Sequence, residues 1–375
     1  MKKVLFVATV VRLHINMFHK PFLRWFHEQG WQVDVAASND YEDKSECVIP
    51  CCDHFYCMPF ERSPIRKGNL LAYRQLKKLL DTEHYDLIHC HTPMGSVIAR
   101  LAAGSARNRG TKVIYTAHGF HFFDGAPLVN WLVYYPIERI LARRTDLLLT
   151  MNGEDYARAK TFPAKEVRKV DGVGLDLSRF VPATPEQKRE VRQMLGLGEN
   201  DFFAISVAQL IKRKNHIVLL NAVSRLRDPA FHLFICGDGV QEQELRQAAA
   251  ALGVEKQVHF LGFRKDVHRL CSAADLFLFA SVQEGLPVAV MEAMACGLPI
   301  VASDIRGNSD LIEPGKGGWL VQPDDVDGFA AAIRGIMADR AGLERMRAHN
   351  LEKVQRYGIE AVTAQMARIY QKMAE

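Results

Sequence analysis

Short apolar runs that alternate with helix-length segments constrain the fold of this chain more than any other feature. The runs lie at 4–10, 33–37, 87–90, 113–116 and 147–150, and then at 203–207, 232–236, 258–261, 276–280, 300–302 and 319–321. This alternation is typical of buried parallel strands joined by crossover helices. It occurs twice in 375 residues, which is too long for one ordinary core. The sequence therefore predicts an α/β protein of two doubly wound, Rossmann-like domains.

The boundary between the two domains is expected where the alternation of strands and helices is interrupted. The stretch GVGLDLSRFVPATPEQ contains Gly172, Gly174, Pro182 and Pro185, and such residues interrupt strands and helices. We therefore expect an N-terminal acceptor-binding domain at 1–172 and a donor-binding domain at 173–357. The segment 358–375 lies beyond the last expected strand, and we predict that it forms a helix crossing back to the first domain.

Two glutamates in EGLPVAVME (284–292) are the strongest site candidates, because ligands of open α/β sheets bind beyond the carboxyl ends of the strands. Glu284 is expected in a loop, and Glu292 about 8 Å further along the following helix. With that offset, the two carboxylates are better placed to bind hydroxyl groups at two ends of one ligand than to share a metal ion or to act as an acid/base pair. An anion is favoured between them by the first N–H groups of the helix, which belong to Gly285, Leu286 and Val288. A nucleotide sugar has this layout.

Ordinary structural roles stay open for these and other residues. Glu284 could cap the helix, whereas Glu292 sits among apolar neighbours and needs a polar partner. Two further candidates have structural alternatives, His118 in the core and Lys214 in the basic run KRKNH. His89 and His91 could suggest a metal, but no third ligand is evident, so a structural role is favoured. The cysteines at 47–57 lack the paired spacing of a zinc site.

Several motifs resemble one family. EGLPVAVME has two glutamates with seven residues between them, and ICGDGVQEQEL, FLGFRKDVHRL and MEAMACGLPIVAS are similar to the donor domain of the retaining glycosyltransferases of the class-four group. YTAHGFHFFDG and IHCHTPMGSVIAR resemble the acceptor domain of its capsule and exopolysaccharide members. The resemblance covers about residues 1–355. It implies the two-domain GT-B fold, with the two domains facing each other across a cleft.

The resemblance also implies roles for individual residues. Glu292 would bind the ribose hydroxyls, Glu284 the transferred sugar, and Lys214 the departing diphosphate, while His118 would lie near the reaction centre. Many relatives have an arginine where this chain has Gln209, which leaves Lys214, Arg213 or Arg264 to neutralise the phosphates. The N-terminal stretch lacks the paired glycines of many members, so we expect a different acceptor loop built around Arg12 and His14.

The expected function is transfer of a hexose from a nucleotide sugar, with uridine as the expected base, to a glycan or lipid-linked acceptor in surface polysaccharide synthesis. No metal and no cofactor are expected. An epimerase on the same fold and a non-catalytic nucleotide-sugar sensor stay open as alternatives. A nicotinamide dehydrogenase is disfavoured, because no G-x-G-x-x-G turn follows the first strand.

The expected location is cytoplasmic, because no apolar window reaches the roughly 18 residues of a membrane span. Residues 1–170 carry 24 Lys and Arg against 17 Asp and Glu. The basic residues are too dispersed to favour a nucleic-acid partner. The segment 61–83 combines leucines with a basic set, and we expect either a solvated helix face or a peripheral contact with the anionic inner membrane face. This basic set consists of Arg62, Arg66, Lys67, Arg74, Lys77 and Lys78.

Overall fold

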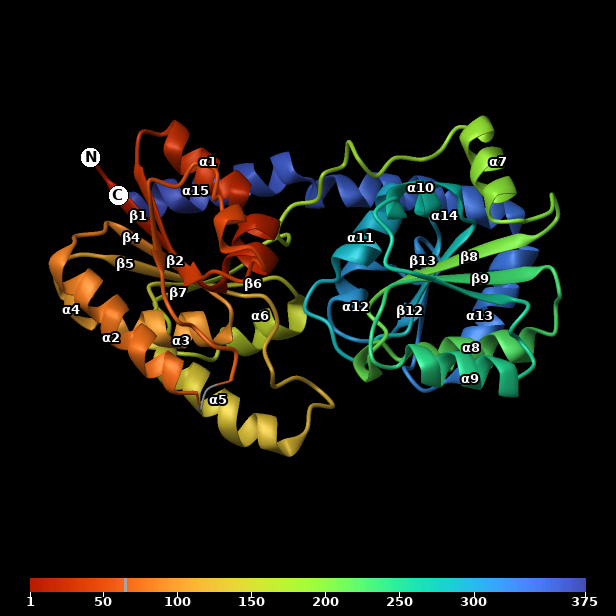
Figure 1. The fold of residues 1–375 in the computed structure, drawn as a ribbon, viewed down its shortest axis with the longest axis horizontal. Coiled ribbons are helices and arrows are strands. Elements are labelled where there is room, and N and C mark those ends of the chain that lie inside the picture. The colour runs from red at the N-terminus through yellow and green to blue at the C-terminus, as the bar shows by residue number, and fades with distance from the viewer. Residues whose placement is uncertain (64–65) are drawn as a thin grey trace. The chain divides into compact units, whose positions relative to one another are not determined.

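The computed structural model describes residues 1–63 and 66–375, which separate into two compact units (Figure 1). Unit 1 comprises Met1–Gly174 and Ile359–Glu375, and unit 2 comprises Leu175–Gly358. The expected limits of 1–172, 173–357 and 358–375 lie within two residues of these. Each unit is built on its own parallel sheet, so the predicted fold class of two Rossmann-like domains is confirmed.

Unit 1 contains a seven-stranded parallel sheet in the order β3-β2-β1-β4-β5-β6-β7. Its strands are β1 (Lys3–Val10), β2 (Gln32–Ser38), β3 (His54–Cys57), β4 (Leu87–His91), β5 (Lys112–Ala117), β6 (Leu147–Thr150) and β7 (Glu166–Lys169). Its helices are η1 (Val11–His19), α1 (Lys20–Glu28), η2 (Lys44–Glu46), α2 (Lys67–Thr82), α3 (Pro93–Ala102), α4 (Gly104–Asn108), α5 (Leu128–Ala142), α6 (Gly153–Ala159) and α15 (Ile359–Ala374). The strand alternation divides the core, since Leu5 and Val7 face α2 and α3 while Phe6 packs against Phe26 of α1.

The C-terminal helix α15 completes the second face of this sheet. Tyr370 of α15 is buried against Phe26, with ring centroids 4.5 Å apart. Its hydroxyl lies 2.9 Å from Nδ1 of His89 on β4, whose Nε2 lies 2.8 Å from Thr116 Oγ1. Both ring nitrogens of His89 therefore have partners, in agreement with the structural role favoured for it.

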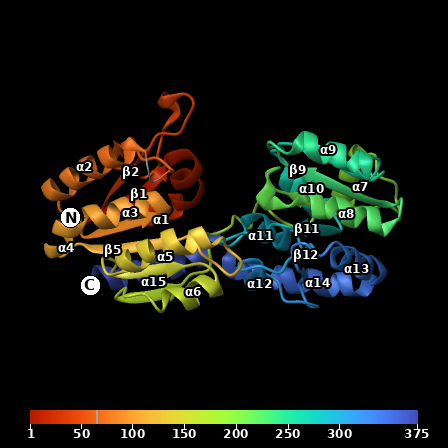
Figure 2. The same cartoon turned by 90° about the horizontal axis from the view of Figure 1, so that it is seen from below.

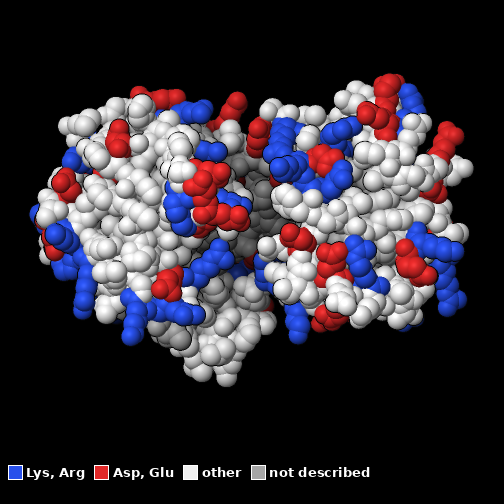
Figure 3. Space-filling view, viewed as in Figure 1, with Lys and Arg blue, Asp and Glu red and all other residues white. Residues whose placement is uncertain are grey.

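On the other face, α2, α3 and α5 lie in one layer, with α3 between the other two (Figures 1 and 2). The inner side of α5 carries a charge, because Glu138 pairs with the buried Arg100 at 2.9 Å. Its outer side is apolar, and Figure 3 shows a largely uncharged lobe where Figure 1 has α5. The exposed apolar residues are Leu128, Val129, Leu132, Val133, Ile137 and Ile140. The exposed side of α5 is therefore more apolar than that of the usual surface helix.

The segment 61–83 forms α2 after a short loop. Its leucine face is divided, since Leu76 and Leu80 are buried but Leu70 and Leu71 are half exposed. Lys77 pairs with Asp81 of the same helix at 2.8 Å. Pro64 and Ile65, which fall in this segment, lie outside the described residues. Among the described helices, none has the length and apolar composition needed to cross a membrane.

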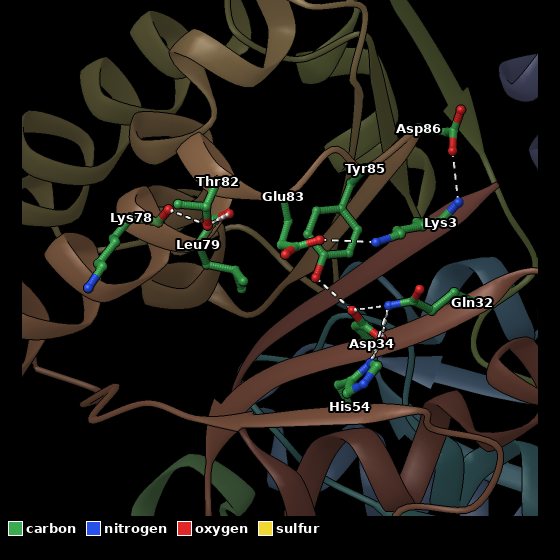
Figure 4. Close-up of polar contacts among 10 residues, drawn as sticks. All are labelled: Lys3, Gln32, Asp34, His54, Lys78, Leu79, Thr82, Glu83, Tyr85 and Asp86. Carbon is green, nitrogen blue, oxygen red and sulfur yellow. Dashed lines mark hydrogen bonds and ion pairs between the residues drawn. The ribbon is translucent and has the colours of Figure 1, made fainter. Parts of the chain in front are cut away.

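The buried Asp34 on β2 is a structural carboxylate (Figure 4). It accepts hydrogen bonds from the hydroxyl of Tyr85 at 2.6 Å and from the side-chain amide of Gln32, and it lies 3.2 Å from a ring nitrogen of His54. Asp34 lies near the start of its strand, at the edge of the sheet opposite the carboxyl ends where ligands bind. Its buried charge is satisfied within the fold.

Unit 2 contains a six-stranded parallel sheet in the order β10-β9-β8-β11-β12-β13. Its strands are β8 (Phe202–Val207), β9 (Phe231–Cys236), β10 (Val258–Gly262), β11 (Leu276–Phe279), β12 (Ile300–Ser303) and β13 (Gly318–Val321). Its helices are α7 (Pro185–Met194), η3 (Lys212–Lys214), α8 (His216–Leu226), α9 (Glu242–Ala251), α10 (Val267–Ala273), α11 (Val288–Ala295), α12 (Asn308–Leu311), α13 (Val326–Ala338), α14 (Arg340–Lys353) and η4 (Val354–Tyr357). Apolar cores lie on both faces of the sheet.

Candidate functional site

Lys214 and Glu284 meet beyond the carboxyl ends of β8 and β11 in unit 2. The Lys214 Nζ atom lies 2.6 Å from Glu284 Oε1, and both side chains are largely buried. Arg213 donates to the same oxygen at 3.2 Å and to the backbone carbonyl of Gln283 at 2.7 Å. Burial lowers the pKa of Lys214, although Glu284 acts in the opposite direction. Two residues predicted to bind adjacent parts of one ligand are thus in contact with each other.

The loop that carries Glu284 is held in place by contacts of its backbone with Arg306 and Gly307. The guanidinium of the buried Arg306 donates through Nε to the carbonyl of Glu284 at 3.0 Å. Gly307 has φ +81° and approaches Gly285 so closely that a Cβ atom there would lie 2.4 Å from the Gly285 oxygen. Only glycine suits that position. Arg306 could not be predicted as a support for this loop, because its role depends on two segments that are separated in the chain.

Glu292 lies inside α11, and Glu284 lies in the loop before it. The helix begins at Val288 with Pro287 as its N-cap residue, so Gly285 and Leu286, whose N–H groups were expected in its first turn, lie in the preceding loop. Burial raises the pKa of Glu292 to about 7, although the charge of Arg179 acts in the opposite direction. A carboxyl group in such surroundings favours a polar partner, and two neighbouring hydroxyl groups on a ligand would supply one.

The remaining predicted residues of unit 2 have different environments. Arg264 makes a two-pronged ion pair with Asp266, at 2.8 and 2.6 Å, so its charge is already neutralised. Gln209 is exposed in the loop after β8. Gly237 and Gly239 pack against that loop, since a Cβ atom on Gly237 would lie 1.9 Å from the Ala208 oxygen. The GDG turn is therefore required by close packing.

Unit 1 gathers four histidines near the carboxyl ends of β1, β4 and β5. His14 and His19 belong to η1, while His91 ends β4 and His118 follows β5. One nitrogen from each ring can be chosen so that all four lie within 4.8 Å of one another. Burial lowers the pKa of all four imidazoles, to about 4 for His118, which favours their neutral form.

The stretch around Arg12 and His14, predicted to form an acceptor loop, is helical in the structure. These residues lie in η1, a π-helix that follows β1 directly and continues into α1. Its first N–H groups, at Arg12 and Leu13, are capped by the carboxylate of Asp40 at 2.5 and 3.2 Å. Because η1 is helical, it turns His14 and His19 inward beside His91, and the exposed Arg12 points away from this group. His19 was not predicted as a site residue.

Comparisons with known protein families agree on both units. The family described as "Glycosyl transferases group 1" matches residues 187–353. The family described as "Glycosyl transferase 4-like" matches residues 3–152. Each match covers the greater part of one unit.

Full-length relatives and solved structures are similar to the chain as a whole. "Putative glycosyltransferase EpsD" of Bacillus subtilis (strain 168) is 40% identical over 373 residues, covering 98% of this chain and 96% of the relative. A "UDP-Gal:alpha-D-GlcNAc-diphosphoundecaprenol alpha-1,3-galactosyltransferase" of Escherichia coli is 31% identical, covering 71% of this chain and 70% of the relative. The crystal structure of Anabaena Alr3699/HepE in complex with UDP matches with a TM-score of 0.81 at 22% identity, covering 99% of this chain and 100% of that one. At that identity it supports the fold alone.

Proposed function

Since this chain belongs to the glycosyltransferase group 1 family, we propose that it moves a hexose from a nucleoside diphosphate sugar to a glycan or lipid-linked acceptor, with retention of anomeric configuration. The observation that carries the proposal is the Lys214–Glu284 contact of 2.6 Å beside the start of α11. It joins a cation suited to phosphate and a carboxylate suited to sugar hydroxyls. Relatives named for colanic acid biosynthesis and for lipopolysaccharide core biosynthesis support a role in exopolysaccharide or capsule synthesis.

The donor is proposed to bind to unit 2. Glu292 would accept the ribose hydroxyls, and the first N–H groups of α11, with Lys214, would face the diphosphate. When the sugar binds, Glu284 would exchange part of its contact with Lys214 for the sugar hydroxyls and leave the ammonium free to approach phosphate. A uridine nucleotide is supported by the Escherichia coli relative at 31% identity, whose name begins with UDP-Gal.

The proposed reaction breaks the bond between the anomeric carbon and the diphosphate oxygen while the acceptor oxygen bonds to the same face of the sugar. The acceptor's proton passes to the departing phosphate oxygen, so no protein nucleophile is needed. Negative charge grows on the diphosphate, and each fixed donor aimed at it is worth roughly 3 kcal/mol. Lys214 and the α11 backbone supply such donors, and we propose that they do so without a metal ion.

The acceptor is proposed to bind to unit 1, where His118 would contribute at the reaction centre. A pocket of about 350 Å³ lies in this unit and is lined by Thr9, His14, Thr92, His121 and Tyr134 together with apolar residues. Its mixture of hydroxyls, imidazoles and rings suits a sugar. Arg62 also lines it and could pair with an acceptor phosphate.

Two alternatives make different predictions about the acceptor. An epimerase would change the sugar of the donor without any acceptor, and a sensor would bind the donor without turnover. The test is a screen of nucleotide sugars by thermal shift, followed by incubation of each hit with and without a diphosphate-linked lipid glycan. Nuclear magnetic resonance of the product would report its anomeric configuration. Donor binding without a glycosylated product from any acceptor, or a product of inverted configuration, would contradict the proposal.

We further propose that unit 1 docks on the anionic inner membrane face, where a lipid-linked acceptor would be found. Membrane docking is supported more by α5, whose exposed side is apolar, than by the basic residues of α2. Burying one such Leu, Ile or Val side chain contributes about 1.5 to 3 kcal/mol. The exposed arginines at the end of this helix, Arg139, Arg143 and Arg144, would add about 1 kcal/mol each on an anionic surface. Arg74 and Lys78 of α2 lie in the same helix layer (Figure 2).

The docking proposal is tested by flotation with vesicles that contain or lack anionic lipid. Binding by the unmodified protein should weaken at high salt, and Leu132→Asp with Ile140→Asp should abolish it. Reversing the charge of Arg74, Lys77 and Lys78 should have a smaller effect. The matched control is Ile217→Asp, a similarly exposed apolar residue of unit 2. A protein that ignores anionic vesicles at low salt, or that buries α5 between two copies in solution, would contradict this docking surface.

A further inference from the structure

The four histidines of unit 1 have more buried nitrogen atoms than hydrogen-bond partners. No partner is present among the described residues for Nε2 of His14, for either nitrogen of His19, or for Nε2 of His91. His19 and His91 are almost completely buried, and His14 is 9% exposed. A buried polar group without a partner costs about 1 to 3 kcal/mol, and native proteins usually satisfy such groups with water or an ion. Ordered water or a bound ion would supply the missing partners.

We propose that His14, His91 and His118 bind one divalent transition-metal ion of the zinc class, a ligand set that the sequence alone did not indicate. Neutral imidazole is a preferred ligand of such ions, and three imidazoles with one open position form an established kind of zinc site. Carboxylates and thiolates are absent from this group. That composition disfavours magnesium and calcium, which require oxygen ligands.

The distances between these three rings fit a common metal. The Nε2 atom of His118 lies 3.4 Å from Nδ1 of His91. Two nitrogens bound at about 2.0 to 2.1 Å to one tetrahedral ion lie roughly 3.3 to 3.4 Å apart. The ring centroids are separated by 4.7 Å for His14 and His118, 5.8 Å for His14 and His91, and 5.5 Å for His91 and His118. The rings are inclined to one another by 49° to 81°, so these three do not stack, and one nitrogen of each lies within 4.8 Å of the others.

His19 has a different role from the other three. Its ring stacks on that of His91, with centroids 3.8 Å apart and an angle of 27° between the planes. Two rings stacked so closely cannot both direct a nitrogen in the ring plane at one ion. His19 therefore acts as a positioning residue that holds the His91 ring, and the three remaining imidazoles form the ligand set. The ion would be a partner for Nε2 of His14, while Nε2 of His91 and the two nitrogens of His19 would be left to ordered water.

The site can be reached from outside. His14 lines the pocket of about 350 Å³ described above, and His118 is partly exposed. An ion could enter there, and the open coordination position would lie on that side. The inference concerns metal binding by the protein without donor or acceptor, and it can hold or fail separately from the proposed sugar transfer. An ion bound to His118 would compete with the role proposed above for that residue at a metal-free reaction centre.

The test uses Co²⁺ as a probe, because cobalt in a site of few ligands has a strong visible absorption band. Chelator-treated full-length protein should bind one equivalent, develop that band and lose it when Zn²⁺ is added. His14→Ala and His91→Ala should each weaken binding by at least about 100-fold, since even second-shell partners are worth about 10 to 100-fold. His19→Phe preserves the stacking and should stay within about tenfold. The matched control is His84→Ala, which removes an exposed histidine of the same unit.

A second measurement covers variants that fail to fold. Proton resonances of ligated imidazoles are strongly shifted by bound Co²⁺, and the unmodified protein should show such signals from three rings. Absence of a band and of shifted signals at equimolar Co²⁺ would overturn the site and leave ordered water as the partner of these nitrogens. A loss in His19→Phe as large as in His14→Ala would overturn the assignment of the three ligands.

Discussion

Replacing Glu292 with glutamine should stabilise the protein at alkaline pH while weakening nucleotide binding. Burial raises the pKa of this carboxyl group from 4.5 to about 7. The folded protein therefore retains a proton that the unfolded chain has lost between these two values, and the free energy of unfolding falls as the pH rises through this window. A shift of this size corresponds to about 3 kcal/mol above pH 7. Glutamine cannot ionise, so this loss in the free energy of unfolding does not occur in the variant.

The expected gain depends on pH in a defined way. Relative to the unmodified protein, Glu292→Gln should raise the free energy of unfolding of unit 2 by about 3 kcal/mol at pH 8 but by less than about 1 kcal/mol at pH 5. Calorimetry at both values would measure this, with the transition of unit 2 identified as the one that UDP shifts in the unmodified protein. The matched control is Glu352→Gln, an exposed acid of the same unit, which should show no such dependence.

The same variant should bind both the nucleotide sugar and the free nucleoside diphosphate more weakly, by roughly 1.5 to 3 kcal/mol, because a charged hydrogen bond to ribose is lost. A gain in stability combined with a loss of affinity would identify a carboxylate retained for its ligand. Equal stability of the two proteins at pH 8 would refute the reasoning, since the carboxylate would then have a partner or access to water in the folded state.

Other substitutions test the remaining contacts. Lys214→Ala should lower turnover at saturating donor by at least about tenfold through lost stabilisation of the diphosphate, and unchanged turnover would exclude that role. Glu284→Gln should leave the affinity for free nucleoside diphosphate nearly unchanged in calorimetric titration while sugar transfer falls, whereas equal losses in this variant and in Glu292→Gln would contradict the division between sugar and ribose. Tyr370→Phe should lower the free energy of unfolding of unit 1 by about 0.5 to 1.5 kcal/mol, as expected for one buried hydrogen bond, and a denaturation curve matching the unmodified protein would argue against the bond to His89.

Most strands were predicted from apolar runs, including the edge strands β10 and β13 of unit 2. All six strands of unit 2 and five of the seven in unit 1 correspond to expected apolar runs. The missed strands are β3 and β7, with the sequences HFYC and EVRK, and both lie at edges of the sheet. Edge strands face solvent and need no continuous apolar run, so periodicity alone does not distinguish them from loops.

The candidate site residues divide along similar lines. The positions of Glu284 and Glu292 relative to α11 follow from local chain geometry and could be predicted. The grouping of His14 and His19 with His91 and His118 could not, because it depends on η1 being helical and on three strands being adjacent in space. The ion pair between Arg264 and Asp266 could not be predicted for another reason. The two residues are close in the sequence, but the sequence does not show in which direction their side chains point.

The return of α15 to unit 1 has a consequence for the time course of synthesis. Tyr370 reaches its place beside Phe26 and His89 only after residues 175–358 have been translated. At about 5 to 20 residues per second, translation of this segment takes roughly 10 to 40 s. During that time the aromatic face of α1 is not covered by α15. Unit 2 is continuous in the chain and can fold during that interval. The nascent unit 1 is then the species that a chaperone would be expected to hold, and a ribosome stalled before residue 359 would present it to proteases.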